Sequence, residues 1–178
     1  MAARKLKLAL TAAGFALLYL QRSFFLYGLI SRAALNEKVD AVVAALGGGE
    51  PARLLLLETA AAETDLGNAI DTSWFVGVGL MQFDKIGFED VQDRTSERNK
   101  SEVMQHFGID VDRATLFDLR WSPLASVVFA RLKYKLIPDP IPETLEGRAA
   151  YWKRYYNSTA GRGTVDHYIK AAVRNGIT

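Results

Sequence analysis

Residues 52–64 form the stretch that most constrains the fold, because it is apolar around almost its whole circumference. It holds four consecutive leucines, Leu54 to Leu57, and four alanines. A helix that is hydrophobic on all sides is buried, so other segments have to surround it. The run from Gly47 to Pro51 breaks the chain before it, and Gly67 is well placed to end it. The pattern therefore predicts a central buried helix that carries Glu63 at its C-terminal end.

The bulk composition favours one folded domain. The chain has 178 residues, of which 49% are hydrophobic and 24% charged, which is typical of a globular protein. The formal net charge of +2 gives no electrostatic footprint for nucleic acid, and we expect no such partner. The sequence has no cysteine, which excludes disulfides, thiolate zinc sites and cysteine nucleophiles. Its two histidines, His106 and His167, lie far apart, so we expect neither a metal site nor a cofactor.

The rest of the chain is predicted to be mainly helical, with a small loop-rich or β insert. The segment 68–78 mixes Asp, Thr, Ser and Gly with two aromatic residues and is where any β-structure is expected, and from Leu80 the pattern turns helical again. Asn36 and the Ser122-Pro123 pair are predicted to begin helices. The further predicted helices cover residues 36–46, 96–107 or 99–107, 112–119, 124–137, 144–156 and 164–174.

The N-terminal segment is predicted to be separate from the folded core. A basic cluster at residues 4–7 precedes an apolar run over 8–30 that is interrupted by Arg22. This run is long enough to span a bilayer, although Arg22 opposes insertion. We therefore interpret residues 1–46 as an uncleaved signal-anchor segment and residues 50–178 as the main domain. Residues 6–30 would then hold the protein at the inner membrane, facing the periplasm. The alternative is a buried or amphipathic helix.

Three motifs in the second part of the chain carry a resemblance to a known superfamily. Glu63-Thr-Asp-Leu-Gly67 is followed by Gly77-Val-Gly-Leu-Met-Gln-Phe-Asp84 and, near the C-terminus, by Tyr155-Tyr-Asn157 ahead of Gly161-Arg-Gly163. In this order they resemble motifs of the soluble lytic transglycosylases and goose-type lysozymes. The resemblance implies an α+β lysozyme-like fold that cleaves the β-1,4 bond between MurNAc and GlcNAc in peptidoglycan glycan strands.

Glu63 is the predicted catalytic acid. Cleavage of a glycosidic bond needs a carboxylic acid that stays protonated near neutral pH, and apolar surroundings favour the protonated form. Glu58 is the rival, but the two side chains point roughly 140° apart on an α-helix and cannot face one cleft. The family's acid precedes its Met-Gln pair by nearly twenty residues, and the nineteen positions from Glu63 to Gln82 match this spacing. Glu58 is then expected to be a surface or supporting residue.

The resemblance also implies the substrate-binding residues. Met81 and Gln82 would lie along the sugar-binding groove, Tyr156 would contact the catalytic glutamate, and Asn157 would help to line the groove. The chain departs from the family pattern by two extra residues before Gly161. The alternatives are a structural turn with a core methionine and an ordinary aromatic helix end.

Asp84 decides between two reaction types. In goose-type lysozymes, paired aspartates hold the attacking water, and Asp84 with Asp71 could form such a pair, whose carboxyl groups would lie about 6.5–9.5 Å apart. Asp84 could equally be a helix N-terminal charge. A lytic transglycosylase needs only Glu63, because the nucleophile is the 6-hydroxyl group of the substrate.

The function expected first is therefore a lytic transglycosylase, encoded by a bacteriophage to lyse or enter its host. A bacterial transglycosylase and a goose-type-like muramidase are the nearest alternatives. A non-catalytic murein-binding protein and a membrane-anchored structural protein are alternatives of another class.

Overall fold

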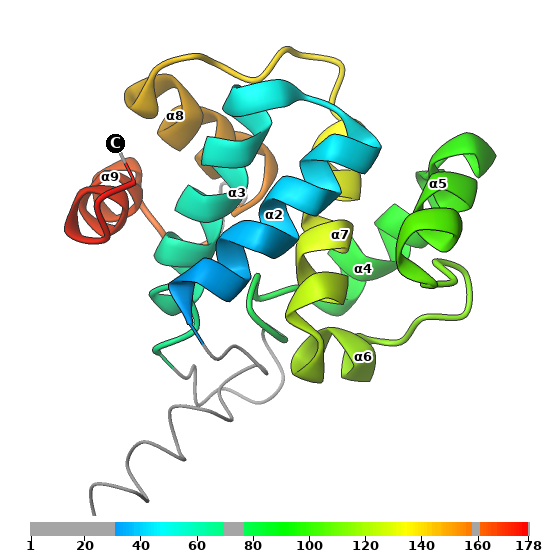
Figure 1. Cartoon of the computed structure of the whole chain (residues 1–178). Helices are drawn as coiled ribbons and strands as arrows, with labels where there is room; N and C mark the ends of the chain where they lie inside the picture. Colours follow the sequence, from blue (N-terminus) through cyan, green and yellow to red (C-terminus); the bar gives the residue numbers. More distant parts are fainter. Residues whose placement is uncertain (1–30, 70–76, 158–160, 178) are drawn as a thin grey trace, which may run out of the picture.

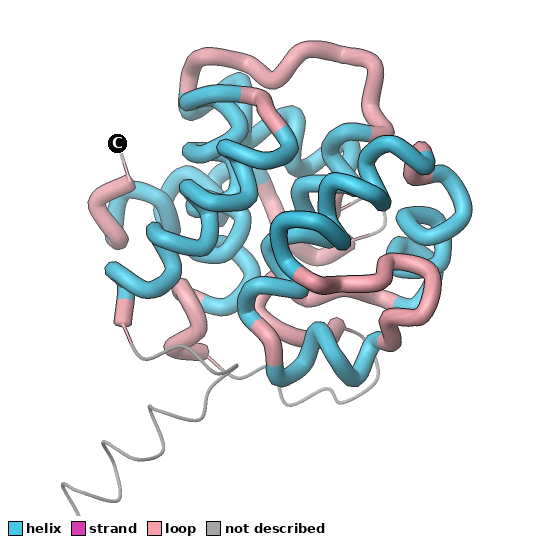
Figure 2. The backbone as a smooth tube through the Cα atoms, turned by 45° about the vertical axis from the view of Figure 1, so that its right-hand side comes forward, coloured by secondary structure: helices cyan, strands magenta, loops and turns pink. Residues whose placement is uncertain are grey.

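The computed structural model describes residues 31–69, 77–157 and 161–177. These ranges form eight helices packed around one core, and the prediction of a mainly α protein is confirmed (Figure 1). Among these residues only Val78 and Phe83 pair as extended backbone, in an isolated antiparallel bridge. Figure 2 shows helices joined by loops, with no strand drawn in the described ranges. The helices are α2 (Arg32–Leu46), α3 (Gly49–Thr64), α4 (Lys85–Arg94), α5 (Glu97–Phe107), α6 (Leu116–Trp121), α7 (Pro123–Lys135), α8 (Leu145–Tyr155) and α9 (Val165–Arg174).

Helix α3 is the predicted central helix. It contacts α2, α7, α8 and α9, and side chains on several of its faces are buried. It begins at Gly49, three residues earlier than predicted. Pro51 is tolerated there because the first-turn N–H groups of a helix have no intrahelical partner.

Polar caps account for most of the other helix boundaries. Ser122, with Pro123 behind it, begins α7 as predicted, and its hydroxyl accepts a hydrogen bond from the Ala125 amide at 3.1 Å. Ser96, Thr144 and Thr164 likewise begin α5, α8 and α9.

Three predicted helix starts are wrong. Ser31, not Asn36, begins α2. The short helix predicted over 112–119 covers 116–121, because a reciprocal capping box between Thr115 and Asp118 fixes its start. The helix expected from Leu80 begins only at Lys85, after a turn.

The predicted boundary between residues 1–46 and 50–178 is also corrected. Helix α2 packs against α3, α5 and α7, and its apolar face, including Leu35, Val39 and Val42, is completely buried. The glycines after it therefore join two helices of one core instead of separating two units.

Several expectations fall on residues outside the described ranges. The signal-anchor segment 6–30, Arg22 and Asp71 are among them, as is most of the expected insert over 68–78. In the part of the chain that the structure describes, no helix has both the length and the apolar character needed to cross a membrane.

A tight turn over residues 78–83 precedes α4. Val78 and Phe83 exchange two backbone hydrogen bonds of 2.9 Å, and the Gln82 amide donates to the Gly79 carbonyl at 3.1 Å. The Thr64 hydroxyl, on the last residue of α3, donates to the Leu80 carbonyl at 2.8 Å. This buried bond fixes the turn against the end of the central helix.

Gly79 is expected to be the most sensitive position of this turn. It has a φ of +73°, and a Cβ there would lie 2.1 Å from the Leu119 carbonyl oxygen. Gly108 has a similar φ of +65° but nothing within 4 Å, so it serves as a matched control. We predict that Gly108→Ala lowers the free energy of unfolding by about 1–2 kcal/mol. Gly79→Ala should add about 3 kcal/mol to that loss, because backbone has to move. Urea unfolding measures both, and equal losses would contradict the tight contact at Gly79.

Candidate functional site

Glu63 lies half-buried in the last turn of α3, where the buried helix reaches the turn region. Its Oε1 accepts a hydrogen bond of 3.0 Å from Nε1 of Trp152 on α8. Asp65 and Leu66, with φ values of 51° and 58°, reverse the chain directly after the helix. The carboxyl group is thus held at the rim of the core by an indole that is itself 1% exposed.

The Gly-Val-Gly-Leu-Met-Gln turn lies next to this end of α3. Gln82 is half-buried, adopts a left-handed φ of 49°, and donates through Nε2 to the Gly79 carbonyl at 2.9 Å. The Gln82 Oε1 lies so close to Gly77 that a Cβ atom on residue 77 would be 2.5 Å from it. The Met81 side chain is completely buried in the core. A groove-lining role for the Met81 side chain therefore does not fit, and the alternative of a core methionine does.

Tyr156 connects this turn to α8. Its hydroxyl is buried and donates to the Met81 carbonyl at 2.7 Å. Burial raises the pKa of the Tyr156 hydroxyl well above its usual value, and the charges of Glu63 and Asp84 add to that effect. The resemblance implies a contact between Tyr156 and Glu63. The hydrogen bond seen at Glu63 comes from Trp152, one helical turn earlier, and the Tyr156 hydroxyl bonds to the Met81 carbonyl. Tyr156 positions the turn.

Asn157 begins the loop between α8 and α9. Its side-chain oxygen accepts a hydrogen bond of 2.9 Å from Lys153, whose ammonium also donates to the Gly161 carbonyl at 2.8 Å. A Cβ on Gly161 would lie 2.1 Å from the Asn157 carbonyl oxygen, so the loop needs glycine there. Asn157 is half-buried, and the extra residues 158–160 lie outside the described ranges.

Asp84 is the N-cap of α4. One carboxylate oxygen, Oδ1, accepts a hydrogen bond of 2.6 Å from the Gly87 amide, and the side chain is exposed. The predicted role as a helix N-terminal charge is confirmed. A role as a base remains a prediction, since its expected partner Asp71 lies outside the described residues.

Lys133 on α7 is a site residue that the sequence reasoning missed. Its ammonium donates to the Tyr156 carbonyl at 3.3 Å and lies 4.3 Å from the centre of the Tyr156 ring. Burial lowers the pKa of Lys133, and the nearby charges of Asp84 and Glu63 partly raise it again. The two acids and this lysine therefore share one electrostatic environment. The available signal was a lysine inside a helix predicted to be apolar.

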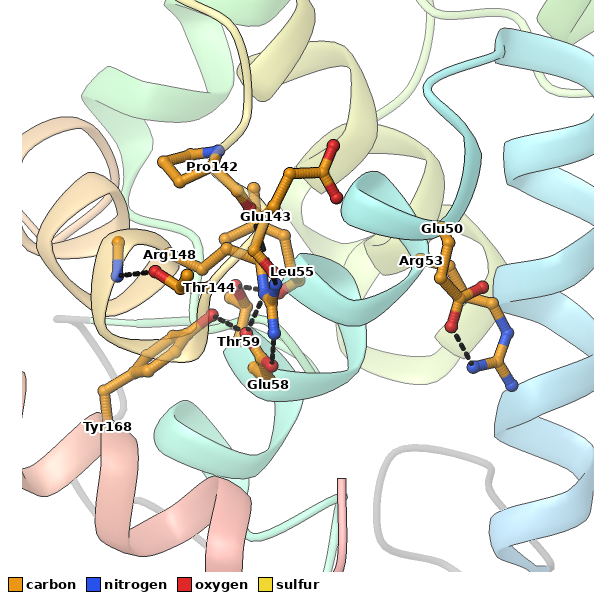
Figure 3. A network of polar contacts seen from close by, with 11 residues as sticks. Glu50, Arg53, Leu55, Glu58, Thr59, Pro142, Glu143, Thr144, Arg148 and Tyr168 are labelled. Atoms are coloured by element: carbon orange, nitrogen blue, oxygen red, sulfur yellow. Dashed lines mark hydrogen bonds and ion pairs between the residues drawn. The ribbon is translucent and has the colours of Figure 1, made fainter. Parts of the chain in front are cut away.

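Glu58 is buried, so the expectation of a surface residue is wrong and its alternative, a supporting residue, fits. It is completely buried, and its carboxylate accepts hydrogen bonds of 2.6 and 2.8 Å from Arg148 and one of 2.9 Å from Tyr168 (Figure 3). Burial raises the pKa of Glu58 against the opposing effect of Arg148 and Tyr168. Because both oxygens are engaged in the core, Glu58 cannot reach a substrate.

No metal centre accompanies these residues in the described part of the chain, where no three His, Asp or Glu side chains converge. Comparisons with protein-family models, with curated proteins and with solved structures gave no match for the chain.

Removing Arg148 should expose the cost of a buried, unpaired carboxylate. We predict that Arg148→Met lowers the free energy of unfolding by about 3–5 kcal/mol, because Glu58 loses its counter-charge. The double variant Glu58→Met/Arg148→Met should lose clearly less, since no charge remains buried. Denaturant titration compares the two. If the double variant is as unstable as the single one, the charge imbalance is not the cause.

Lys133 should cost stability near neutral pH. Its folded-state pKa is lowered, so the protonated ammonium opposes folding below that pKa, and the penalty disappears as the pH rises toward the ordinary lysine value. We predict that Lys133→Met raises the free energy of unfolding at pH 7 by about 0.5–2 kcal/mol, with the gain shrinking at alkaline pH. Exposed Lys170→Met is the control. A less stable Lys133→Met protein at pH 7 would contradict this reasoning.

Proposed function

We propose that the protein is a lytic transglycosylase of lysozyme-like architecture that cleaves the β-1,4 bond between MurNAc and GlcNAc in peptidoglycan. The observation that supports this best is the position of Glu63. It is a half-buried carboxyl group at the end of a buried helix, held by Trp152 and bordered by a turn that Thr64 and Tyr156 fix in place. A positioned carboxyl group of this kind is the one group that the reaction requires.

Glu63 would act twice in the reaction. It first donates its proton to the glycosidic oxygen as the bond from that oxygen to the muramic C1 breaks. The carboxylate then accepts the proton of the muramic 6-hydroxyl group. At the same time the oxygen of that hydroxyl group bonds to C1 and closes the 1,6-anhydro ring. The proton balance returns Glu63 to its starting state, so neither a water molecule nor a second acid is consumed.

The polar groups around Glu63 would bind the glycan strand. Gln82 and Asn157 are both half-buried and carry amide groups that can pair with sugar hydroxyls. Met81 supports the site through its backbone, because its carbonyl accepts the hydrogen bond by which Tyr156 holds the turn. Lys133 supplies a positive charge beside the two acids, which suits the carboxylates of murein.

A hydrolase of the goose type is the second candidate, and one observation favours it. The second oxygen of Asp84, Oδ2, makes no hydrogen bond within the described residues, and the side chain is exposed. It is therefore available to orient a water molecule, which an inverting mechanism would need.

The proposed setting is the periplasm of a bacterium, with the protein encoded by a phage for lysing or entering its host. A bacterial transglycosylase is the alternative origin. Two alternatives belong to another class. A non-catalytic murein-binding protein would bind murein without cleaving it, and a membrane-anchored structural protein would neither bind nor cleave it.

Glu63→Gln is the decisive variant. Glutamine keeps an oxygen that accepts the Trp152 hydrogen bond but cannot donate or accept the catalytic proton. We predict a loss of activity of about 10²–10⁴-fold in a sacculus-clearing assay, with thermal unfolding and pelleting with murein unchanged. Clearing at the wild-type rate by Glu63→Gln would refute the assigned acid. Murein binding by a wild-type protein that clears nothing would favour the binding-protein alternative.

Asp84→Asn separates the two reaction types. Asparagine is as good an N-cap as aspartate, so the fold of α4 should persist. A transglycosylase should retain activity within a few-fold, whereas a muramidase that depends on Asp84 should lose about 10²-fold or more. The same clearing assay measures this, with the circular dichroism spectrum as the folding control.

A further inference from the structure

A cavity lies at the opposite end of α3 from Glu63. It is a cavity of about 340 Å³ between the start of α3, the end of α7 and the loop that leads to α8. Figure 1 shows this loop crossing the end of the molecule where α3 begins. The fifteen-residue length of α3 up to Glu63 corresponds to roughly 20 Å, so this cavity is separate from the proposed catalytic site. The lining residues include Gly48, Arg131, Tyr134, Lys135, Ile141 and Tyr151.

Arg131 is the unusual residue of this cavity. Arg131 is only 6% exposed, and burial lowers the pKa of its guanidinium. Nε donates to the Gly47 carbonyl at 2.9 Å, but neither terminal nitrogen makes a hydrogen bond within the described residues. No carboxylate there lies within ion-pair distance either. Buried charges are normally paired, so this guanidinium lacks a counter-charge.

A second cation borders the same cavity. Lys135 donates to the Leu46 carbonyl at 2.7 Å, and its pKa is lowered by burial and by repulsion from Arg131 and Arg98. One acidic residue, Asp139, also lines the cavity and accepts a hydrogen bond from the Tyr155 hydroxyl. Two cations against one carboxylate leave the lining with a net positive charge.

Capping of α2 explains only part of this arrangement. The bonds from Arg131 and Lys135 to Gly47 and Leu46 satisfy carbonyl groups at the C-terminal end of that helix. They use one donor group of each side chain, so the two terminal nitrogens of the Arg131 guanidinium are left without a hydrogen bond among the described residues. The N-terminus of α3 at Gly48 also has no side-chain cap, so its N–H groups add positive potential to the same cavity.

We propose that this cavity binds a small organic anion, a phosphate or carboxylate attached to an apolar or aromatic body. The two terminal nitrogens of Arg131 match the paired oxygens of such a group, and Lys135 adds charge. Tyr134, Tyr151 and Ile141 form apolar walls for the body of the ligand. The volume falls in the range of about 300–1,000 Å³ that is usual for small-molecule sites.

Phenyl phosphate is the probe that tests this, with inorganic phosphate and phenol as its two halves. Titrated into the isotope-labelled full chain at low salt, phenyl phosphate should shift amide signals of residues 47–51 and 131–141. It should bind about tenfold more tightly than inorganic phosphate, and phenol should not bind. Added salt should weaken the binding.

Three variants assign the binding to the cavity. Arg131→Lys keeps the charge but loses the two-nitrogen fork, and Lys135→Gln removes the second charge, so each should weaken phenyl phosphate about tenfold. Lys170→Gln removes the same charge from the exposed face of α9 and should change nothing. Circular dichroism establishes that each variant is folded.

Signals that shift elsewhere, phenol binding as well as phenyl phosphate, or an equal effect of Lys170→Gln would each overturn the site. Since the test uses no glycan, its failure would leave the assignment of Glu63 untouched.

Discussion

The burial of α3 is the constraint on which the rest of the structure depends. A helix that is apolar on all sides has to be enclosed, and α2, α7, α8 and α9 enclose it. Each polar side chain on α3 therefore needs either a buried partner or access to the surface. Glu58, in the middle, is neutralised by Arg148 and hydrogen-bonded by Tyr168, whereas Glu63, in the last turn, reaches the rim half-buried. The same burial thus makes Glu58 structural and leaves Glu63 at the rim, where the proposed reaction needs a carboxyl group.

Helix α8 is the second organiser of the proposed site. Trp152 and Tyr156 are four residues apart and so lie on one face of the helix. The first holds Glu63 and the second holds the Gly-Leu-Met-Gln turn. Lys133 packs over Tyr156 from α7, which brings a third element to the same place. The site is therefore built by tertiary packing of segments about 20 to 90 residues apart, and a shift of α8 would move the acid and the turn together.

Much of the fold could be predicted because the signals were local. Capping residues and apolar periodicity gave the positions of α5, α7, α8 and α9, and the apolar run gave α3. Helix geometry indicated that Glu63 and Glu58 do not face one cleft, and the spacing to Gln82 in the resembling family favoured Glu63. The buried position of Glu58 agrees with that choice. The role of Glu63 itself, and the lysozyme-like resemblance, remain predictions.

What could not be predicted depends on distant partners. The burial of Glu58 needs Arg148 and Tyr168, which lie 90 and 110 positions away. The hydrogen bond from the Trp152 indole to Glu63 joins residues 89 positions apart, so no local pattern indicates it. The glycines after α2 indicate a break in helix but say nothing of whether the two helices pack together. Lys133 was hidden because a lysine in an apolar helix is an exception to the pattern that defines the helix.

If this chain breaks glycan strands through Glu63 alone, as proposed, the products released from purified sacculi identify the reaction. We would digest sacculi with the wild-type protein and with Glu63→Gln, and weigh the released muropeptides by mass spectrometry. We expect fragments that end in 1,6-anhydro-muramic acid, lighter than hydrolysed fragments by one water molecule, from the wild type only. Fragments with reducing ends would contradict the single-acid mechanism and move the role of base to Asp84. No fragments from folded wild-type protein would contradict the enzyme itself.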